Sequence, residues 1–409
     1  MSPPACPPPV RPIGIGLVGA GYMGKRHAVA MQAVGATFDT VLRPVCETIC
    51  TTTAESGARA ARALGFRRHV TDWRALVDDP RVEAVVIASP QSTHREIALA
   101  AIAAGKPVLC EKPLGASLAD AEAMAAAARA AGVVTAVGFN YARTPATRHA
   151  RRLIEDGALG RLTWIRAEHT EDFLADPEAP ASWRTRGAAN GTLGDLAPHI
   201  VDAALALAGP IASVLADVET VHATRPGASG PEPVTNDDHA HALVRFARGT
   251  LGHLHFSRIA TGRKMGYAYE VVGTDGAIRF DQEDQNALWL YRRADEGDGG
   301  GDGGAGGGAN AGFRKILTNG AHPDYAAFCE GPGHGTGYQD QLVIEARDFL
   351  AAIEAGEPRR PSFEDGLAVS RVVAACRASA ASGTWTEVAG NGRRGASDGR
   401  LDARDRSRP

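Results

Sequence analysis

The sequence predicts an α/β protein of two domains: a parallel-sheet domain at the N-terminus, then an α+β domain with a large open, mostly antiparallel sheet. Short apolar runs alternate with helix-like segments from residue 13 to residue 137, which indicates parallel βαβ units. Beyond residue 160, strand-like runs follow one another with few helices between them. The 409 residues also exceed what a single typical core holds.

The first strand-like run, 13–18, is followed at once by the loop 19–24, whose sequence is GAGYMG. In a Rossmann dinucleotide-binding domain the first glycine permits a tight turn, the second lets the backbone approach the pyrophosphate, and the third allows close packing of helix on strand. We therefore expect the cofactor to be bound by Gly19, Gly21, Tyr22, Met23 and Gly24. A structural turn that binds nothing is the alternative, and the strand before the loop and the helix after it disfavour that alternative.

A second strand is predicted over 41–46, with Glu47 at its end. An acid roughly 20 residues beyond the glycine loop accepts hydrogen bonds from the ribose hydroxyls of NAD and repels the 2′-phosphate of NADP. Glu47 therefore favours NAD as the cofactor, with NADP less favoured. The alternative is a solvated acid at the start of a helix.

The apolar run 83–88 is followed by Ser89 and Pro90, with His94 on the first turn of the next predicted helix. We expect Ser89 and Pro90 to shape the nicotinamide side of the cleft. His94 is either part of that site or a packing and capping residue, and the sequence favours the two equally.

Glu111-Lys112-Pro113 follows the buried run 107–110. Lys112 is thereby expected at the carboxyl edge of the parallel sheet, where open α/β sheets bind ligands. A lysine there donates to a substrate hydroxyl and, with its pKa lowered by burial, takes part in proton transfer. The alternative is a surface lysine in a turn.

In the second domain, Asp195 and His199 are four residues apart, so a helix would put them on one face. Pro198 is tolerated only in the first turn, which predicts a helix that starts near Asp195 or Leu196. An acid and a histidine on one face, opposite Lys112, form a set of groups suited to proton transfer. Without Lys112, the sequence would favour the alternative that Asp195 and His199 are an exposed acid and histidine with no role in proton transfer.

The remainder of the second domain is predicted to contain strands over 162–168, 214–221, 241–246, 250–257, 267–273 and 277–280, and helices over 341–354 and 367–381. His253 and His255 share one face of a strand, and we interpret them as surface or interface residues. No metal site is predicted.

Composition excludes several classes of protein. The net charge of -3 gives no reason to expect a nucleic-acid or membrane-surface partner, and no apolar run is long enough to span a membrane. The six cysteines are scattered and residues 1–9 have no apolar signal core, so we expect a reduced, cytoplasmic setting.

Three segments are predicted to be disordered because they bury too little apolar surface: 1–12, the glycine-rich insertion 297–312, and 389–409. The predicted domains are therefore 13–139 for the cofactor and 140–388 for the substrate and for oligomerisation.

Several motifs occur together in a recognisable order. They are GAGYMG with His27, Ser89-Pro90 with His94, Glu111-Lys112-Pro113, the run 138–141, Asp195 with His199 and Asp202, and the run 363–367. With them, nearly the whole ordered chain resembles the Gfo/Idh/MocA family of glucose-fructose oxidoreductases and inositol dehydrogenases. Blocks within 176–195 and 321–338 are most similar to an anhydrosugar-oxidising subgroup.

The resemblance implies an NAD-dependent dehydrogenase that oxidises a secondary alcohol of a sugar, anhydrosugar or cyclitol. It implies that Lys112, Asp195 and His199 are catalytic, that Glu111 and Lys112 also border the cofactor, and that the second sheet is the face of a homodimer or homotetramer. Further pocket residues are expected to be Asn140, Tyr141, Arg143, Trp183, Arg184 and His322. Ala142 departs from the family pattern, in which relatives often carry arginine after Asn-Tyr.

Two other functions fit the same fold. One is a redox-assisted, NAD-dependent glycosidase of the same family, and the other is a non-enzymatic NAD-sensing regulator. The presence of Lys112, Asp195 and His199 together disfavours the regulator, because a sensor does not require all three.

Overall fold

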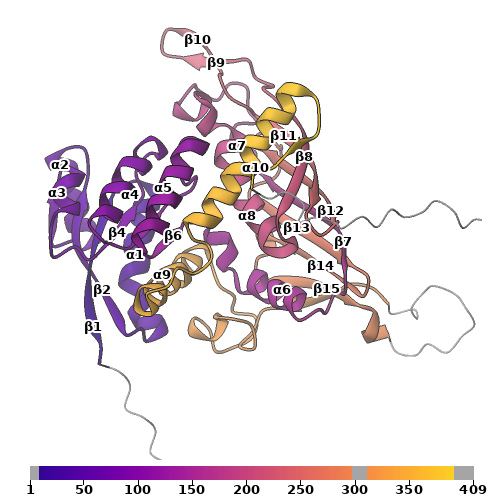
Figure 1. Ribbon diagram of the computed structural model, residues 1–409, viewed down its shortest axis with the longest axis horizontal. Helices are drawn as coiled ribbons and strands as arrows, with labels where there is room; N and C mark the ends of the chain where they lie inside the picture. The colour runs from indigo at the N-terminus through magenta and orange to yellow at the C-terminus, as the bar shows by residue number, and fades with distance from the viewer. Residues whose placement is uncertain (1–8, 297–310, 391–409) are drawn as a thin grey trace, which may run out of the picture.

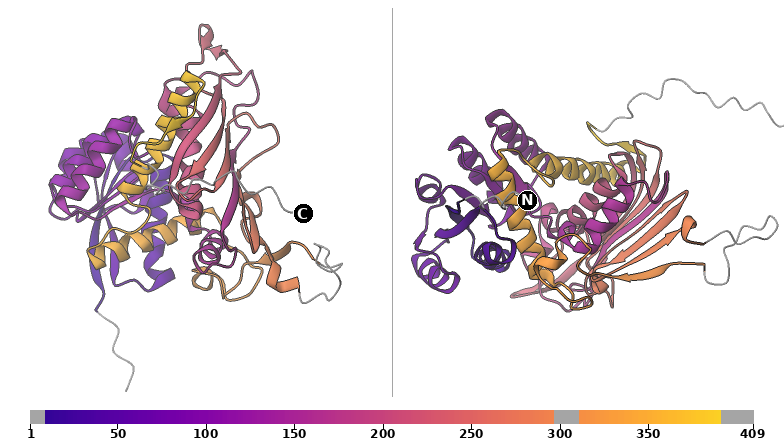
Figure 2. Two further views of the ribbon diagram at one scale, coloured as in Figure 1. Left: turned by 45° about the vertical axis from the view of Figure 1, so that its right-hand side comes forward. Right: turned by 90° about the horizontal axis from the view of Figure 1, so that it is seen from below.

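The computed structural model describes residues 9–296 and 311–390, and these form two domains that lie side by side (Figures 1 and 2). The predicted insertion 297–312 and both predicted tails fall largely outside the described residues. The prediction of disorder is wrong for Arg11 and Pro12, because they pair with the neighbouring parallel strand as the first residues of the strand Arg11–Val18. In the described part, every helix is too short or too polar to be a membrane-spanning segment.

The first domain is the predicted Rossmann domain. Its described strands form a six-stranded parallel sheet in the order β3-β2-β1-β4-β5-β6. The strands are β1 Arg11–Val18, β2 Leu42–Cys50, β3 Arg68–Val70, β4 Ala84–Ile87, β5 Val108–Cys110 and β6 Thr135–Val137. The helices are α1 Tyr22–Phe38, α2 Ala54–Leu64, α3 Trp73–Val77, α4 His94–Ala103 and α5 Leu118–Ala131.

Local sequence explains these elements. All residues of β4 and β5 are buried, as expected for parallel strands covered on both faces. Thr53 and Ser117 cap the N-termini of α2 and α5 by accepting backbone hydrogen bonds, and Gly65 and Gly132 end these helices in the left-handed conformation.

The second domain is built on a nine-stranded sheet in the order β16-β15-β14-β13-β7-β12-β11-β8-β17, within the described residues. Neighbouring strands are antiparallel except β7 and β12, so the predicted mostly antiparallel sheet is confirmed. The strands are β7 Leu162–Thr170, β8 Ile211–Glu219, β11 His239–Phe246, β12 Leu251–Ser257, β13 Gly266–Gly273, β14 Gly276–Asp281, β15 Ala287–Arg292, β16 Arg314–Leu317 and β17 Thr386–Glu387.

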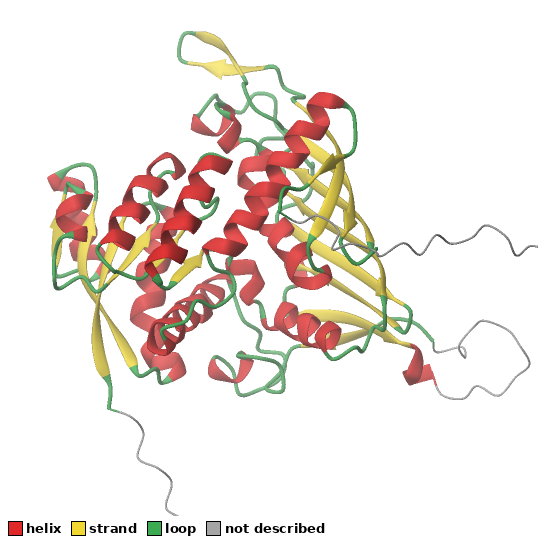
Figure 3. Cartoon of the chain, in the orientation of Figure 1, coloured by secondary structure: helices red, strands yellow, loops and turns green. Residues whose placement is uncertain are grey.

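A separate hairpin, β9 Thr224–Gly227 with β10 Gly230–Pro233, projects from one end of the sheet (Figure 1). The sequence analysis located the six strands β7, β8 and β11–β14 and missed β15–β17 and this hairpin. Helices lie against one face of the large sheet and leave the other face uncovered (Figures 2 and 3). The α-helices that follow residue 139 in the described chain are α6 Pro145–Glu155, α7 Thr192–Asp195, α8 Ala197–Ala208, α9 Tyr338–Ala355 and α10 Phe363–Ser382.

The C-terminal helices tie the two domains together. Helix α9 packs on α1, and its residues Leu342, Phe349 and Leu350 share a core with Ile13 and Leu17 of β1. Helix α10 packs on α5 of the first domain and on α8 and β8 of the second. The predicted boundary at residue 139 therefore separates the two sheets but not the cores, because the first core is completed by a helix about 200 residues further along the chain.

Candidate active site

Lys112 lies where the parallel sheet meets the second domain. It follows β5 directly, as predicted, and its side chain is largely buried, at 16% exposure. Its ammonium donates hydrogen bonds to the carboxylate of Asp195, at 2.7 Å, and to the backbone carbonyl of the same residue, at 2.9 Å. The prediction that Lys112 faces Asp195 across the cleft is thus confirmed by geometry.

Asp195 is positioned by the short helix α7. The first turn of α7 is anchored because the Asp237 carboxylate accepts a hydrogen bond from the Leu193 backbone N–H at 2.6 Å. At Gly194 any Cβ would lie 2.2 Å from the carbonyl oxygen of Ala189, so only glycine fits next to Asp195. Burial alone would raise the pKa of Asp195, but the charge and hydrogen bond of Lys112 hold it below its ordinary value, so Asp195 is a carboxylate.

His199 lies in the first turn of α8, with Pro198 one residue before it, as the position of that proline requires. One detail of the prediction is wrong: Asp195 ends α7 and His199 belongs to α8, so the two do not share one helix. Asp195 hydrogen-bonds to Lys112, and the charge of Lys112 acts on His199, whose pKa it lowers. Leu196, between the two helices, keeps helical backbone angles.

The His199 imidazole is buried among aromatic rings. Its centroid lies 4.7 Å from that of Tyr141, 5.5 Å from His169 and 6.0 Å from Phe139. Burial and the positive charge of Lys112 lower the pKa of His199 well below its ordinary value, so the ring is neutral at pH 7. Its Nδ1 atom is buried and lacks a hydrogen-bond partner among the described residues.

Beneath Lys112 lies a buried acid–histidine group. Glu111 accepts a hydrogen bond from the backbone N–H of Lys112 at 3.2 Å and is paired with His27 of α1 at 2.7 Å. Glu345 of α9 lies 4.0 Å from the other nitrogen of His27, and burial raises its pKa to about 7. These contacts hold the Lys112 backbone against α1 and α9. The predicted role of Glu111 at the cofactor stays a prediction.

The glycine loop has the shape a dinucleotide requires. Gly19 has φ +98°, and a Cβ on Gly24 would lie 2.1 Å from the carbonyl oxygen of Gly19, so both positions need glycine. A Cβ on Gly21 would meet no described atom within 4 Å, which leaves open space beside that backbone. No side chain caps α1, so the backbone N–H groups at Tyr22 and Met23 are available to a pyrophosphate. These residues fit NAD.

Glu47 does not lie where the sequence analysis expected it. Strand β2 continues through Cys50, so Glu47 is inside the strand, buried, and its carboxylate is paired with Arg67 at 3.2 Å and Arg68 at 2.8 Å. The predicted strand end was wrong. A charged residue after an apolar run predicts the end of a strand, but the two arginines neutralise Glu47 inside the sheet. The residues after β2 are Thr51, Thr52 and Thr53.

The segment after β4 is held in place by His94. Its two ring nitrogens lie 2.9 Å from the carbonyl oxygen of Ser89 and 3.0 Å from that of Pro113. Burial lowers the pKa of His94, and the neutral ring has a single N–H, so it donates to only one of these two carbonyl oxygens. His94 thus connects the turn at Ser89 and Pro90 with the turn that follows Lys112, which supports a positioning role over contact with the cofactor.

The loop that carries Trp183 and Arg184 borders the cleft. The Arg184 guanidinium lies 4.3 Å from the Trp183 ring and 5.7 Å from the Phe173 ring, and its charge contributes to the lowered pKa of Asp195. Trp183 is 56% exposed, and the Arg184 guanidinium lies over one face of its ring. These two predicted pocket residues therefore lie near the Lys112 group.

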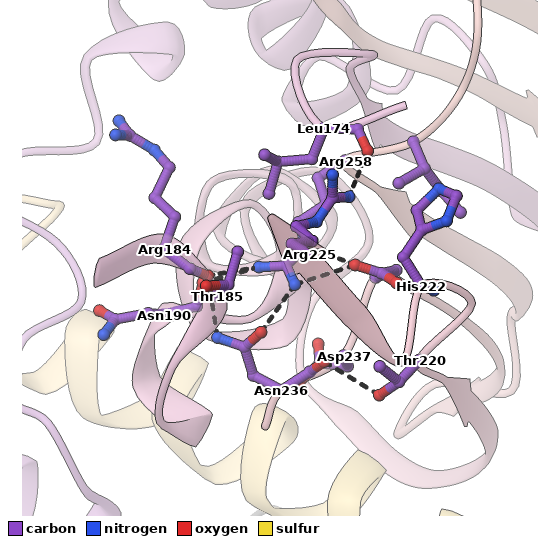
Figure 4. A network of polar contacts seen from close by, with 12 residues as sticks. Leu174, Arg184, Thr185, Asn190, Thr220, His222, Arg225, Asn236, Asp237 and Arg258 are labelled. Atoms are coloured by element: carbon purple, nitrogen blue, oxygen red, sulfur yellow. Dashed lines mark hydrogen bonds and ion pairs between the residues drawn. The ribbon is translucent and has the colours of Figure 1, made fainter. Parts of the chain in front are cut away.

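Buried polar residues clamp this loop from below (Figure 4). The backbone carbonyl of Arg184 accepts hydrogen bonds from Arg258 at 2.7 Å and from Asn236 at 2.9 Å, while the Arg184 side chain extends away from the network. Arg225, also fully buried, donates to the carbonyl oxygen of Leu174 at 2.6 Å. The buried guanidinium groups of Arg225 and Arg258 thus hold the backbone of this loop in place, while the Arg184 side chain stays outside the network.

The other predicted pocket residues divide into two groups. Tyr141 packs on His199 and belongs to the site. The other three have partners elsewhere: Asn140 donates to Gln341 at 2.8 Å, Arg143 is paired with Asp348 at 2.9 Å, and His322 packs on His149 of α6. Among the described residues, none of the three forms a hydrogen bond or an ion pair with Lys112, Asp195 or His199. Their assignment as substrate ligands stays a prediction, and their contacts favour a structural role.

Two residues near the site were missed. His169 of β7 lies 2.9 Å from the carbonyl oxygen of Leu196, at the junction of α7 and α8, and its ring faces His199. Tyr338, at the start of α9, lies 6.2 Å from Tyr22 and 6.1 Å from Tyr141, measured between ring centroids. No local motif marks either residue, since each reaches the site only through long-range folding.

The described apolar cavity between Pro113, Leu193 and Val369, about 220 Å³, lies behind the Lys112 turn. It is lined mainly by small and apolar side chains and includes neither Lys112 nor His199. The group of Lys112, Asp195 and His199 therefore lies outside this cavity.

A Rossmann domain with an open glycine loop, joined to a sheet domain that presents a lysine, an acid and a neutral histidine, defines a nucleotide-dependent oxidoreductase. Residues 13–139 match the model of the oxidoreductase family with an NAD-binding Rossmann fold, and residues 147–279 match that of the GFO/IDH/MocA C-terminal domain. The chain belongs to the Gfo/Idh/MocA family of oxidoreductases, which confirms the resemblance.

Individual relatives cover nearly the whole chain. Levoglucosan dehydrogenase of Pseudarthrobacter phenanthrenivorans is 37% identical over 393 residues, which are 92% of this chain and 98% of that protein. A levoglucosan dehydrogenase in complex with NADH and levoglucosan superposes with a TM-score of 0.87 at 37% identity, covering 93% of this chain and 100% of that one. An oxidoreductase domain protein from Kribbella flavida gives a TM-score of 0.86 at 41% identity, covering 93% of this chain and 100% of that one.

Proposed function

We propose that this protein oxidises a secondary alcohol of a sugar, anhydrosugar or cyclitol with NAD, and that an anhydrosugar like levoglucosan is its preferred substrate. The observation that carries the proposal is the meeting of Lys112, Asp195 and neutral His199 at the carboxyl edge of the parallel sheet. The similarity to levoglucosan dehydrogenase supports the substrate class.

In the proposed mechanism His199 accepts the hydroxyl proton, because its neutral ring offers a lone pair at pH 7. Lys112 donates a hydrogen bond to the same oxygen and stabilises the negative charge that develops on it. Asp195 fixes the Lys112 ammonium through the 2.7 Å contact and presents its second oxygen to a neighbouring hydroxyl.

The cofactor would be held by the backbone of Gly19, Gly21, Tyr22, Met23 and Gly24, with the turn at Ser89 and Pro90 beside the nicotinamide. When bound, NAD supplies the hydride acceptor. Thr51 and Thr53, rather than Glu47, follow the end of β2, so we infer that threonine hydroxyls meet the adenosine ribose there.

The substrate would lie between Lys112 and the rim formed by Trp183 and Arg184. An exposed indole face suits the apolar face of a sugar ring, and a guanidinium beside it suits hydroxyl groups. Tyr141 would close the inner side of the pocket, next to His199.

The test is to incubate the purified protein with NAD and levoglucosan, L-sorbose, D-glucose or myo-inositol, and to record the absorbance of NADH. Saturable NADH formation with one of them, greatest for levoglucosan, is expected. NAD binding without NADH formation from any polyol would favour the sensor, and glycoside cleavage without net NADH would favour the redox-assisted glycosidase.

We also infer a homodimer or homotetramer that uses the uncovered face of the large sheet, and a cytoplasmic location. The uncovered face carries four large apolar side chains that are each at least 36% exposed, Trp164, Leu243, Leu251 and Trp289, and exposed apolar side chains of this kind suit an interface. Among the described residues five cysteines are free, which suits a reducing compartment. Sedimentation of the purified protein tests the oligomer.

A further inference from the structure

Four histidines gather on the uncovered face of the large sheet. His239 and His241 belong to β11, and His253 and His255 belong to β12. The strands are antiparallel neighbours, and the register pairs His241 directly with His255. The intervening residues, such as Ala242 and Leu254, are buried in the core, so the imidazoles point to the opposite side from the helices and the cleft.

The four rings lie close together. His241 stacks on His255 with centroids 4.2 Å apart and planes 6° apart, and on His253 at 5.4 Å and 12°. One nitrogen each from His239, His241 and His255 lies within 4.8 Å of the other two. Tetrahedral zinc, at Zn–N distances of about 2.0–2.1 Å, requires nitrogens about 3.4 Å apart whose lone pairs converge, so the stacked His241 and His255 rings would rotate out of their parallel arrangement to bind an ion.

Carboxylates flank this group as they do in metal sites. Glu219 of β8 lies 2.9 Å from the Nε2 atom of His239, and Glu168 of β7 lies 3.8 Å from the Nδ1 atom of His255. Second-shell carboxylates orient histidine ligands and raise their basicity. Two arginines lie nearby: Arg166 is paired with Glu270 at 3.3 Å, and Arg263 is paired with Glu168 itself at 3.3 Å.

We propose that His239, His241 and His255 form a binding site for a divalent transition-metal ion of the zinc class, on the sheet face opposite the active site. The expectation of no metal site rested on the absence of a close Cys or His spacing in the sequence. Two His-x-His pairs from separate strands make such a site only once β11 and β12 are paired. The ion would join these two strands, and it takes no part in the proposed oxidation.

The experiment uses the full chain without a histidine tag, stripped with EDTA and dialysed. Titration calorimetry with Zn²⁺ and the visible absorption of Co²⁺ give the stoichiometry and the coordination. We expect one ion per chain with micromolar affinity. We also expect a loss of at least tenfold in affinity in His241→Ala and in His255→Ala. The control is His334→Ala, an exposed loop histidine outside the group, which should bind as the unmodified protein does.

Absence of saturable binding by the unmodified protein would overturn the proposal, and this result does not depend on any variant folding. Unchanged affinity in both His241→Ala and His255→Ala, with NADH binding intact as the sign of a folded chain, would do the same. Equal loss in His334→Ala would assign the ion to another part of the surface.

Discussion

Histidines lie on both sides of the large sheet, and the groups that surround the two sets differ. On the helix-covered side, His199 and His169 are enclosed by Tyr141 and Phe139 and lie beside a lysine. On the uncovered side, His239, His241 and His255 lie beside two carboxylates. Burial lowers the pKa of His199 and of His241 alike, so a neutral imidazole alone does not distinguish a catalytic base from a metal ligand.

The charge of the neighbouring groups distinguishes the two sets of histidines. A positive charge next to a neutral histidine repels a metal ion and stabilises an anionic oxygen, so the Lys112 side suits alcohol oxidation. Carboxylates next to a neutral histidine attract a cation and orient the ring, so the open face suits a metal. The charge of the second group therefore decides the chemistry of each face, and the following predictions test that comparison.

The largest effect is expected on the lysine side. Lys112→Ala should lower turnover by about 10²- to 10⁴-fold, since one group that stabilises the reacting oxygen is lost. NAD affinity, measured by NADH fluorescence, should stay close to normal because the glycine loop holds the cofactor. Lys315→Ala, an exposed lysine on the large sheet, is the matched control. Retention of more than about a tenth of the turnover would remove Lys112 from the chemistry.

His199→Ala should cost a similar factor, about 10²- to 10⁴-fold in turnover. The double variant with Lys112→Ala should be little worse than either single variant, because both groups serve one proton transfer. His253→Ala, on the other face, should leave turnover unchanged. Additive losses in the double variant would argue that the two groups act in separate steps.

Glu345 should show its effect in stability. Its pKa of about 7 in the folded protein against 4.5 in the unfolded chain means that the folded state binds more protons between these values. The free energy of unfolding should therefore fall as pH rises from 4.5 to 7, by on the order of 3 kcal/mol. His27, whose pKa is raised by Glu111 and Glu345 against the effect of burial, acts in the same direction.

Glu345→Gln keeps the shape of the side chain and cannot ionise, so it should remove most of this decline and stabilise the protein at pH 8. Urea unfolding at several pH values measures it. Glu354→Gln, on the exposed side of the same helix, is the control. An equally steep decline in Glu345→Gln would assign the pH dependence to another group.

The pH dependence of turnover separates the two histidine sets directly. Because the pKa of His199 lies well below 6.5, turnover should stay level from pH 8 to below 6.5 and fall only at more acidic pH. Removing the charge in Lys112→Gln should raise the pKa of His199 and shift this acid limb to higher pH in the residual activity. An acid limb at the same pH in both proteins would show that Lys112 does not act on the titrating group.

The smallest effect is expected on the open face. A pKa of about 4 for folded His241, against 6.5 unfolded, means that the folded state binds fewer protons, so stability is lost as pH falls from 6.5 towards 4. Solvent screening at this exposed ring reduces the loss to about 1 kcal/mol. His241→Gln, unfolded in urea with EDTA present, should flatten the curve in that range, and His334→Gln should not.

Local sequence was sufficient for much of the first domain. The alternation of buried runs and helices, the GAGYMG loop and Lys112 after a buried strand are short-range patterns, and each was found where predicted. Pro198 similarly located the start of α8 to within two residues, since proline is tolerated only in a first helical turn. The family also followed from the sequence, because several such motifs occur in one order.

Glu47 shows where local patterns fail. A charged residue after an apolar run predicts a strand end, but Arg67 and Arg68, about twenty residues later, pair with it and let β2 continue. The role of α9 in completing the first core, and the approach of Tyr338 and His169 to His199, likewise depend on contacts between distant segments.

The sequence by itself therefore determined the fold class and the cofactor loop, because these depend on hydrophobic periodicity and backbone constraints that act within a few residues. It also offered a lysine, an acid and a histidine as candidate site residues, and their catalytic role stays a prediction. Only the tertiary structure decided which charges surround each histidine. That decision depends on strand pairing and on helix packing across hundreds of residues, and it turns His199 towards a lysine and His241 towards other histidines and carboxylates.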